Sequence, residues 1–106
     1  MFFKKKQKKF KEADNTAVFT TKYVIREGKP ITYVTHEVED GAWQFLSSDE
    51  FENFAEVIMI VGLGEIVALD PSLLDLADMP VGYYAIRETV NDKWSIRQQA
   101  NPPNVG

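Results

Sequence analysis

The chain has 106 residues, of which 44% are hydrophobic and 26% are charged, and its formal net charge is −4 at pH 7. These values are typical of one soluble globular domain. The chain contains no cysteine, which excludes disulfides, thiolate metal sites and a cysteine nucleophile.

Charge is distributed unevenly along the chain. Residues 1–11 contain six lysines and no acidic residue, whereas residues 30–86 contain neither lysine nor arginine and carry eleven carboxylates. Without residues 1–11 the chain has 6 basic and 16 acidic side chains, a net charge of −10. Such a field repels nucleic acid and attracts cationic surfaces. We therefore expect a protein partner with a basic surface, and no nucleic acid bound through the acidic part.

The chain is expected to have three parts. Residues 1–12 are predicted to form a basic, flexible arm, residues 13–98 a single domain, and residues 99–106 a loose tail. The lysines of the arm are not followed by the apolar stretch of a secretion signal. The longest apolar run, residues 57–63, is too short to span a bilayer. The sequence thus predicts a cytoplasmic protein without a transmembrane segment.

The first half of the domain has the pattern of strands. Alternation predicts a half-buried strand over residues 17–26, and β-branched residues predict another over residues 31–38. An Asp-Gly pair at positions 40 and 41 favours a hairpin into a third strand, residues 42–46. We expect these three strands to form an antiparallel meander.

The second half mixes short helices with strands. Ser47 and Glu50 have the spacing of a capping box and predict a short helix, followed by a buried strand over residues 56–61. One or two helical turns are expected over residues 65–69. Asp70-Pro71 predicts the start of another helix.

Residues 81–88 and 93–97 predict a final hairpin. The predicted class is therefore α+β, with a mostly antiparallel sheet of about five to six strands and two short helices.

Two features invite a catalytic interpretation. A strand that runs into Gly62 and Gly64 suggests nucleotide binding, but Val67 occupies the place of the third glycine, and the glycines are better explained by a tight turn. His36 is the only histidine. Its apolar neighbours in the strand favour a structural or solvent-facing role, and a metal-dependent enzyme centred on His36 and nearby carboxylates is the alternative. No catalytic residue, metal ligand or cofactor is predicted.

The densest acidic cluster comprises Asp49, Glu50, Glu52 and Glu56. A solvated helix face would explain it, and the calcium-loop pattern is absent. The surrounding span without cations favours a contact surface for a basic partner, because ordinary surfaces intersperse the two signs. Asp75 and Asp78 are weaker candidates for the same surface. Trp43 and Trp94 are predicted to be core anchors.

The lysine arm allows other interpretations. It could dock on anionic lipid or nucleic acid, which would make the chain an adaptor. It could also lie across the acidic surface of its own domain and compete with an outside partner.

Residues 41–49 and 69–87, followed by Lys93-Trp94, resemble a bacterial family called immunity protein 33. The shared features are Gly41, Trp43 with Phe45, Asp49-Glu50, Asp70-Pro71-Ser72-Leu73, Pro80 with Gly82, Arg87 and Trp94. The resemblance covers about residues 20–97, and Ser48 stands where the family has glycine. It implies a non-enzymatic cytosolic protein that binds a cognate bacterial toxin and blocks it.

Overall fold

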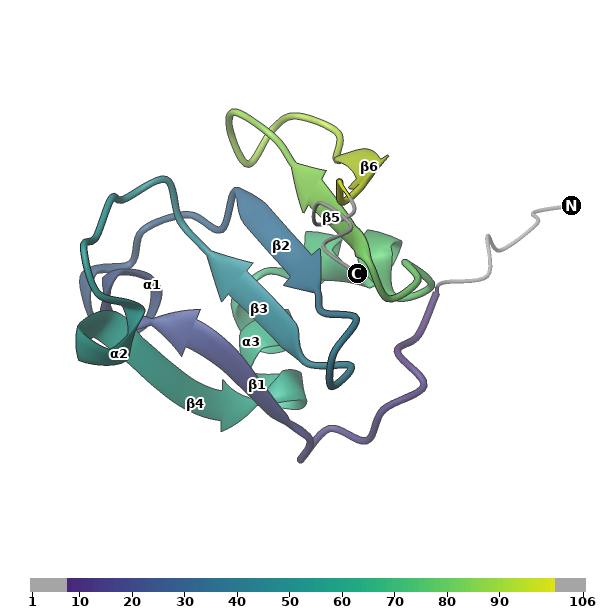
Figure 1. The fold of residues 1–106 in the computed structure, drawn as a ribbon, viewed down its shortest axis with the longest axis horizontal. Coiled ribbons are helices and arrows are strands. Elements are labelled where there is room, and N and C mark those ends of the chain that lie inside the picture. The colour runs from purple at the N-terminus through teal and green to yellow at the C-terminus, as the bar shows by residue number, and fades with distance from the viewer. Residues whose placement is uncertain (1–7, 101–106) are drawn as a thin grey trace, which may run out of the picture.

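A computed structural model describes residues 8–100, which form an α+β fold with one mixed, mostly antiparallel sheet (Figure 1). Six strands and four short helical segments occur in that range. In chain order they are β1 (Ala17–Thr21), α1 (Lys22–Glu27), β2 (Tyr33–His36), β3 (Trp43–Leu46), α2 (Phe54–Val57), β4 (Ile58–Gly62), α3 (Leu63–Leu69), the 3₁₀ helix η1 (Pro71–Leu76), β5 (Tyr83–Ile86) and β6 (Ser95–Gln98).

The strand order is β4-β1-β3-β2-β5-β6. The two predicted hairpins are confirmed, since β2 pairs antiparallel with β3 and β5 pairs antiparallel with β6. The predicted meander is wrong, because β1 pairs with β3 instead of β2 and runs parallel to it. The chain passes from β1 through α1 to β2, which lies two places away in the sheet, and the β2–β3 hairpin then brings β3 back between them, parallel to β1.

The strand predicted over residues 17–26 ends at Thr21, and its second half is the helix α1. The Thr21 side chain accepts a hydrogen bond from the Val24 backbone N–H and caps the helix. Gly28 ends the helix in the left-handed region, at φ 67°, and donates its backbone N–H to the Tyr23 carbonyl. A threonine cap and a terminal glycine are helix boundary signals that outweigh the alternating pattern between them.

The capping box predicted at Ser47 does not form. The Ser47 hydroxyl donates to the Asp49 carboxylate at 2.7 Å, and α2 begins seven residues later with Asn53 as its cap. The Ser47 oxygen accepts a hydrogen bond from the Asp49 backbone N–H at 3.4 Å, whereas a capping box would have it accept from the N–H of Glu50. The strand predicted over residues 56–61 exists as β4, but it is an edge strand and Ile60 is 63% exposed, so the prediction of a buried strand is wrong.

Gly62 and Gly64 do not form the tight turn that the sequence suggested, because β4 continues directly into α3. The first N–H groups of α3 are occupied by the preceding chain: Leu63 donates to the Thr16 carbonyl and Gly64 to the Asp14 carbonyl. A Cβ on Gly64 would lie 3.0 Å from Cβ of Asp14. These glycines therefore allow residues 14–16 to approach the helix closely.

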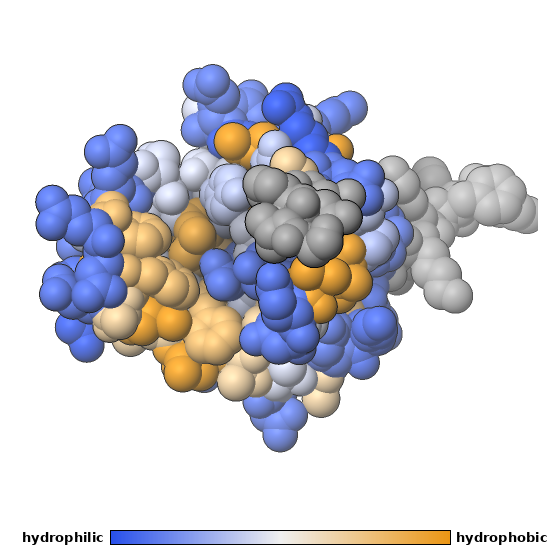
Figure 2. Space-filling view, in the orientation of Figure 1, coloured by the Kyte–Doolittle hydropathy of each residue, from blue (hydrophilic) through white to orange (hydrophobic). Residues whose placement is uncertain are grey.

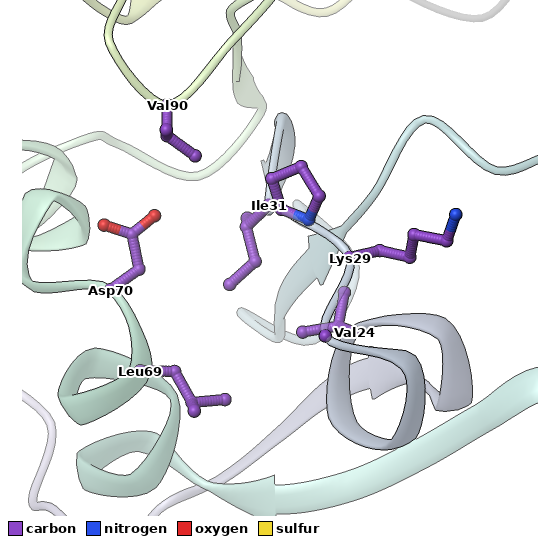
Figure 3. Close-up of a pocket in the computed structure, with 8 residues that line it drawn as sticks. Val24, Lys29, Ile31, Leu69, Asp70 and Val90 are labelled. Carbon is purple, nitrogen blue, oxygen red and sulfur yellow. The ribbon is translucent and has the colours of Figure 1, made fainter.

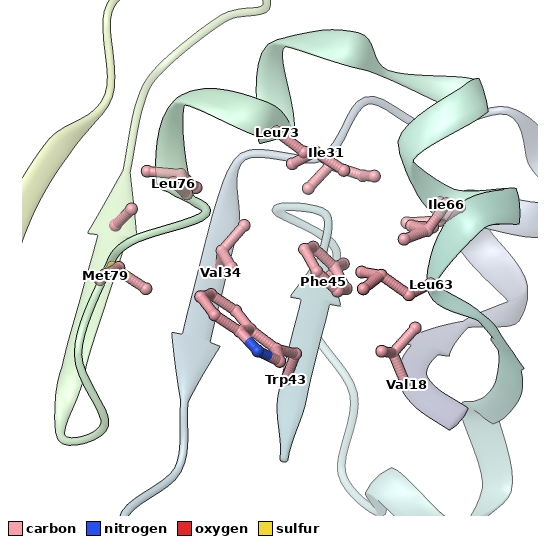
Figure 4. Packing of buried hydrophobic residues seen from close by; sticks show 12 residues of the cluster. Val18, Ile31, Val34, Trp43, Phe45, Leu63, Ile66, Leu73, Leu76 and Met79 are labelled. Atoms are coloured by element: carbon pink, nitrogen blue, oxygen red, sulfur yellow. The ribbon is translucent and has the colours of Figure 1, made fainter. Parts of the chain in front are cut away.

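The hydrophobic core lies between one face of the sheet and the helical layer (Figure 4). Trp43, a predicted core anchor, and Phe45 project from β3 toward α3 and η1 and are 2% and 0% exposed. The helical layer contributes Leu63, Ile66, Leu73 and Leu76, none more than 1% exposed. Every helix that reaches this core lies behind the sheet in Figure 1, so among residues 8–100 no helical layer covers the opposite face.

A buried arginine joins the two layers. Arg87 follows β5, and its side chain is only 1% exposed. Its guanidinium donates to the Ile31 carbonyl at 2.8 Å and 3.1 Å, to the Ser72 hydroxyl at 2.9 Å and to the Asp70 carboxylate at 2.5 Å. The Trp94 ring covers it at 4.0 Å. Asp70 also caps η1 through the Ser72 N–H, as the sequence predicted. Four residues quoted for the resemblance to immunity protein 33 thus hold η1 against the sheet: Asp70, Ser72, Arg87 and Trp94.

The N-terminal residues that the structure describes lie against the domain. Phe10 packs edge-on against Trp43, with ring centroids 5.0 Å apart, and Glu12 accepts a hydrogen bond from the indole N–H of Trp43. Lys8 forms an ion pair with Asp78 at 3.2 Å. Residues 1–7 of the expected arm and residues 101–106 of the expected tail lie outside the described residues. Within residues 8–100 no helix is long and apolar enough to cross a membrane.

We predict that Asp70→Ala lowers the free energy of unfolding by about 3–5 kcal/mol, because it removes the carboxylate from a buried guanidinium. Urea denaturation monitored by circular dichroism measures this change. Asp75→Ala, at an exposed position of the same 3₁₀ helix, should change stability by less than about 0.5 kcal/mol. Equal losses in the two variants would contradict a structural role for the Arg87–Asp70 pair.

Candidate functional site

The four clustered carboxylates lie on one segment between β3 and β4. Asp49, Glu50 and Glu52 belong to the connection after β3, and Glu56 lies in α2. We call residues 49–56 the acidic segment. Glu50, Glu52 and Glu56 are exposed and Asp49 is half-buried. In the part of the chain that the structure describes, no lysine or arginine forms an ion pair with any of the four.

An aromatic pair accompanies these acids. Phe51 is 37% exposed and its ring stacks on Phe54, with centroids 5.5 Å apart. An exposed aromatic ring among charged neighbours has the composition of an interface anchor with a polar rim. The acidic segment therefore offers apolar contact area as well as negative charge.

Asp75 and Asp78 lie elsewhere. The connection after β3 starts at Leu46, which pairs with Tyr33 at the first residue of β2. Asp78 precedes Met79, whose carbonyl lies 2.7 Å from Nδ1 of His36 at the last residue of β2. The six candidate carboxylates thus divide between opposite ends of β2. At the Asp78 end, Lys8 of the same chain forms the ion pair described above.

His36 is buried on the face of the sheet that carries the hydrophobic core. It is 4% exposed, and its ring lies flat against Trp43 with centroids 3.8 Å apart. Because a carbonyl oxygen can only accept a hydrogen bond, Nδ1 of His36 carries the hydrogen and donates this bond to the Met79 carbonyl. This is the structural environment that the sequence favoured for His36. Among residues 8–100, no three His, Cys, Asp or Glu side chains are placed to hold a metal ion together.

The open face of the sheet is a feature that sequence reasoning missed. Phe19 of β1 lies between Ile60 of β4 and Gln44 of β3, and the row continues through Thr35 and Tyr84. Residues opposite one another on paired strands share a face. Figure 2 shows apolar side chains gathered over β1, β3 and β4, with hydrophilic side chains beside them at the α2 end of the molecule. The apolar run of β4 was the available signal, but only the strand order reveals that it lies at an edge.

Two pockets flank the sheet without a converging catalytic set. One, of about 340 Å³, is formed by Val24, Ile31 and Leu69 beside Asp70, while Lys29 extends away from it (Figure 3). The Asp70 carboxylate is already bound by Arg87 and Ser72. The other, of about 870 Å³, lies beside β5 and β6 and mixes cations with acids, Lys93, Arg97, Glu88 and Asp92.

Comparison with protein-family models, with curated proteins and with solved structures finds no match for this chain. The resemblance to immunity protein 33 stated above therefore rests on the quoted residues alone.

Tyr33 on the open face has a perturbed pKa. Burial raises the pKa of its phenol above the ordinary value of 10.0, and the neighbouring Tyr84 and Glu37 raise it further. The folded state thus favours the neutral phenol. As pH rises past 10.0 the unfolded state ionises first, so stability is complete below that pH and is lost as pH rises through the folded-state pKa.

We predict that Tyr33→Phe removes this part of the alkaline destabilisation. The free energy of unfolding, measured by urea titration at pH values from about 9 to about 11.5, should fall less steeply in the variant than in the unmodified chain. Parallel pH profiles would show that the Tyr33 phenol ionises equally easily in both states.

Proposed function

We propose that this chain is a small acidic binding protein, not an enzyme, and that the acidic segment is its recognition site for a cationic protein. The observation that carries the proposal is the combination of four carboxylates without an ion pair in the described residues and an exposed ring, Phe51, among them. In this interpretation the apolar ring supplies contact area, and the surrounding carboxylates select the partner.

The charge distribution favours rapid capture of such a partner. Complementary charge raises the association rate constant, and the effect weakens as salt increases. A carboxylate without an ion pair in the free protein contributes more binding free energy when a cation approaches than a carboxylate that is already paired. Asp78 has Lys8, whereas the acidic segment has no internal ion pair in the described residues. We therefore place the main contact at Asp49, Glu50, Glu52 and Glu56, with Asp75 and Asp78 as secondary contacts.

The biological role that we propose is immunity: the protein binds a cognate bacterial toxin in the cytoplasm and blocks it. The resemblance to immunity protein 33 supports this role. A toxin that attacks nucleic acid needs a cationic active site, and an acidic protein seated there would mimic the charge of the substrate. The proposal does not depend on any particular toxin chemistry.

The direct test is charge reversal in the acidic segment. The partner would be isolated from the native cell with the tagged full-length chain, identified, purified and titrated by calorimetry. We expect Glu50→Lys/Glu52→Lys to weaken binding by at least about tenfold, because each reversal places a cation against a cationic surface.

A matched variant controls for net charge. Glu39→Lys/Glu88→Lys changes the total charge equally at two exposed positions outside the acidic segment, and it should bind nearly as tightly as the unmodified chain. Unchanged affinity in the Glu50/Glu52 variant, or equal losses in both variants, would contradict a site at the acidic segment.

A further inference from the structure

The outer edge of β4 is an unusual feature of this sheet. β4 lies at one end of the strand order, and among the strands of residues 8–100 it pairs only with β1, over residues 58–62. In Figure 1 no other labelled element runs along its outer side. An edge strand presents unpaired backbone N–H and C=O groups that can hydrogen-bond to another extended chain.

β4 also lacks the features that normally discourage such pairing. Its sequence, IMIVG, contains no charged residue and no proline, and Ile60 is 63% exposed. Natural edge strands are commonly protected by lysine, proline or a bulge. Here the five residues pair with β1 in an uninterrupted register. The strand is therefore suited to accept a second neighbour, which would be the seventh strand of the sheet.

Charge at the two ends of β4 indicates what that neighbour is. Glu56 precedes the strand in α2 and is exposed. At the other end, a Cβ on Gly62 would lie 3.6 Å from the Glu65 carboxylate, and one on Gly64 would lie 3.2 Å from Cγ of Asp14. Lys22 follows β1, which pairs with the inner side of β4, and its ammonium group lies over the Tyr23 ring.

A second copy of this chain does not fit that edge. Antiparallel pairing of two β4 strands would bring Glu56 of one copy toward Glu65 of the other, and parallel pairing would bring identical acids together. Both arrangements oppose like charges across the new ladder, which is destabilising. An extended segment with basic side chains meets complementary charge at both ends.

We infer that the partner adds a strand to β4, through an extended cationic segment that hydrogen-bonds along residues 58–62. This inference rests on the proposed function and deepens it, because β4 follows the acidic segment directly in the chain. Backbone pairing supplies affinity, and alternate side chains of the added strand contact Ile58 and Ile60 on the open face. The acidic segment and the β4 edge then act as one continuous binding surface.

The test uses ¹⁵N-labelled full-length protein and synthetic peptides. A peptide of alternating lysine and valine should shift the amide resonances of residues 58–62. A peptide with glutamate in place of lysine should not bind, and neither should the lysine peptide with N-methyl groups along the hydrogen-bonding side. Ile60→Lys should weaken the lysine peptide by about tenfold or more, whereas Ile96→Lys, on the other edge strand β6 where Ile96 is 46% exposed, should not.

Three outcomes would overturn the inference: shifts that map to β6 or to the centre of the open face, equal binding of the N-methylated peptide, or self-association of the unmodified chain that Ile60→Lys abolishes. Because this readout does not involve the native partner, its failure would leave the charge-reversal test of the acidic segment intact. Conversely, the peptide could pair with β4 while Glu50→Lys/Glu52→Lys leaves the affinity for the native partner unchanged. That result would overturn only the proposed site at the acidic segment.

Discussion

The buried guanidinium of Arg87 is the interaction on which the arrangement of the two layers depends. A charge with a side chain 1% exposed is costly unless it is fully paired, and Arg87 meets that requirement by joining the loop before β2, the start of η1 and the Trp94 ring. The same contacts hold η1 beside α3 on one face of the sheet. Within residues 8–100, the helices that reach the core cover only that face, and no helix covers the other face or the β4 edge.

This arrangement also determines which charges are free to act on a partner. The carboxylate of Asp70 forms an ion pair with the buried Arg87, and that of Asp78 forms one with Lys8. The latter pair is largely exposed and contributes little to stability, but it places Lys8, a residue of the predicted lysine arm, at one end of β2. The acidic segment lies at the opposite end, and its four carboxylates form no ion pair within residues 8–100.

The sequence allowed the local features to be predicted and left the long-range ones open. The Asp40-Gly41 turn and the Asp70-Pro71 helix start depend on neighbouring residues, and both occur as expected. The helix after Thr21 was missed because alternation resembled a strand, while the cap and Gly28 determined the outcome. Parallel pairing of β1 with β3, the exposed position of β4 and the separation of Asp78 from the acidic segment follow from contacts between distant residues, which no local pattern reveals.

Hydrogen–deuterium exchange on the full-length chain, free and saturated with its purified native partner, tests the central claim most directly. The account predicts that the partner slows exchange in the acidic segment and in β4, residues 49–62, and leaves β6 unchanged. Slower exchange confined to β5 and β6, or to η1, with residues 49–62 unaffected, would contradict it.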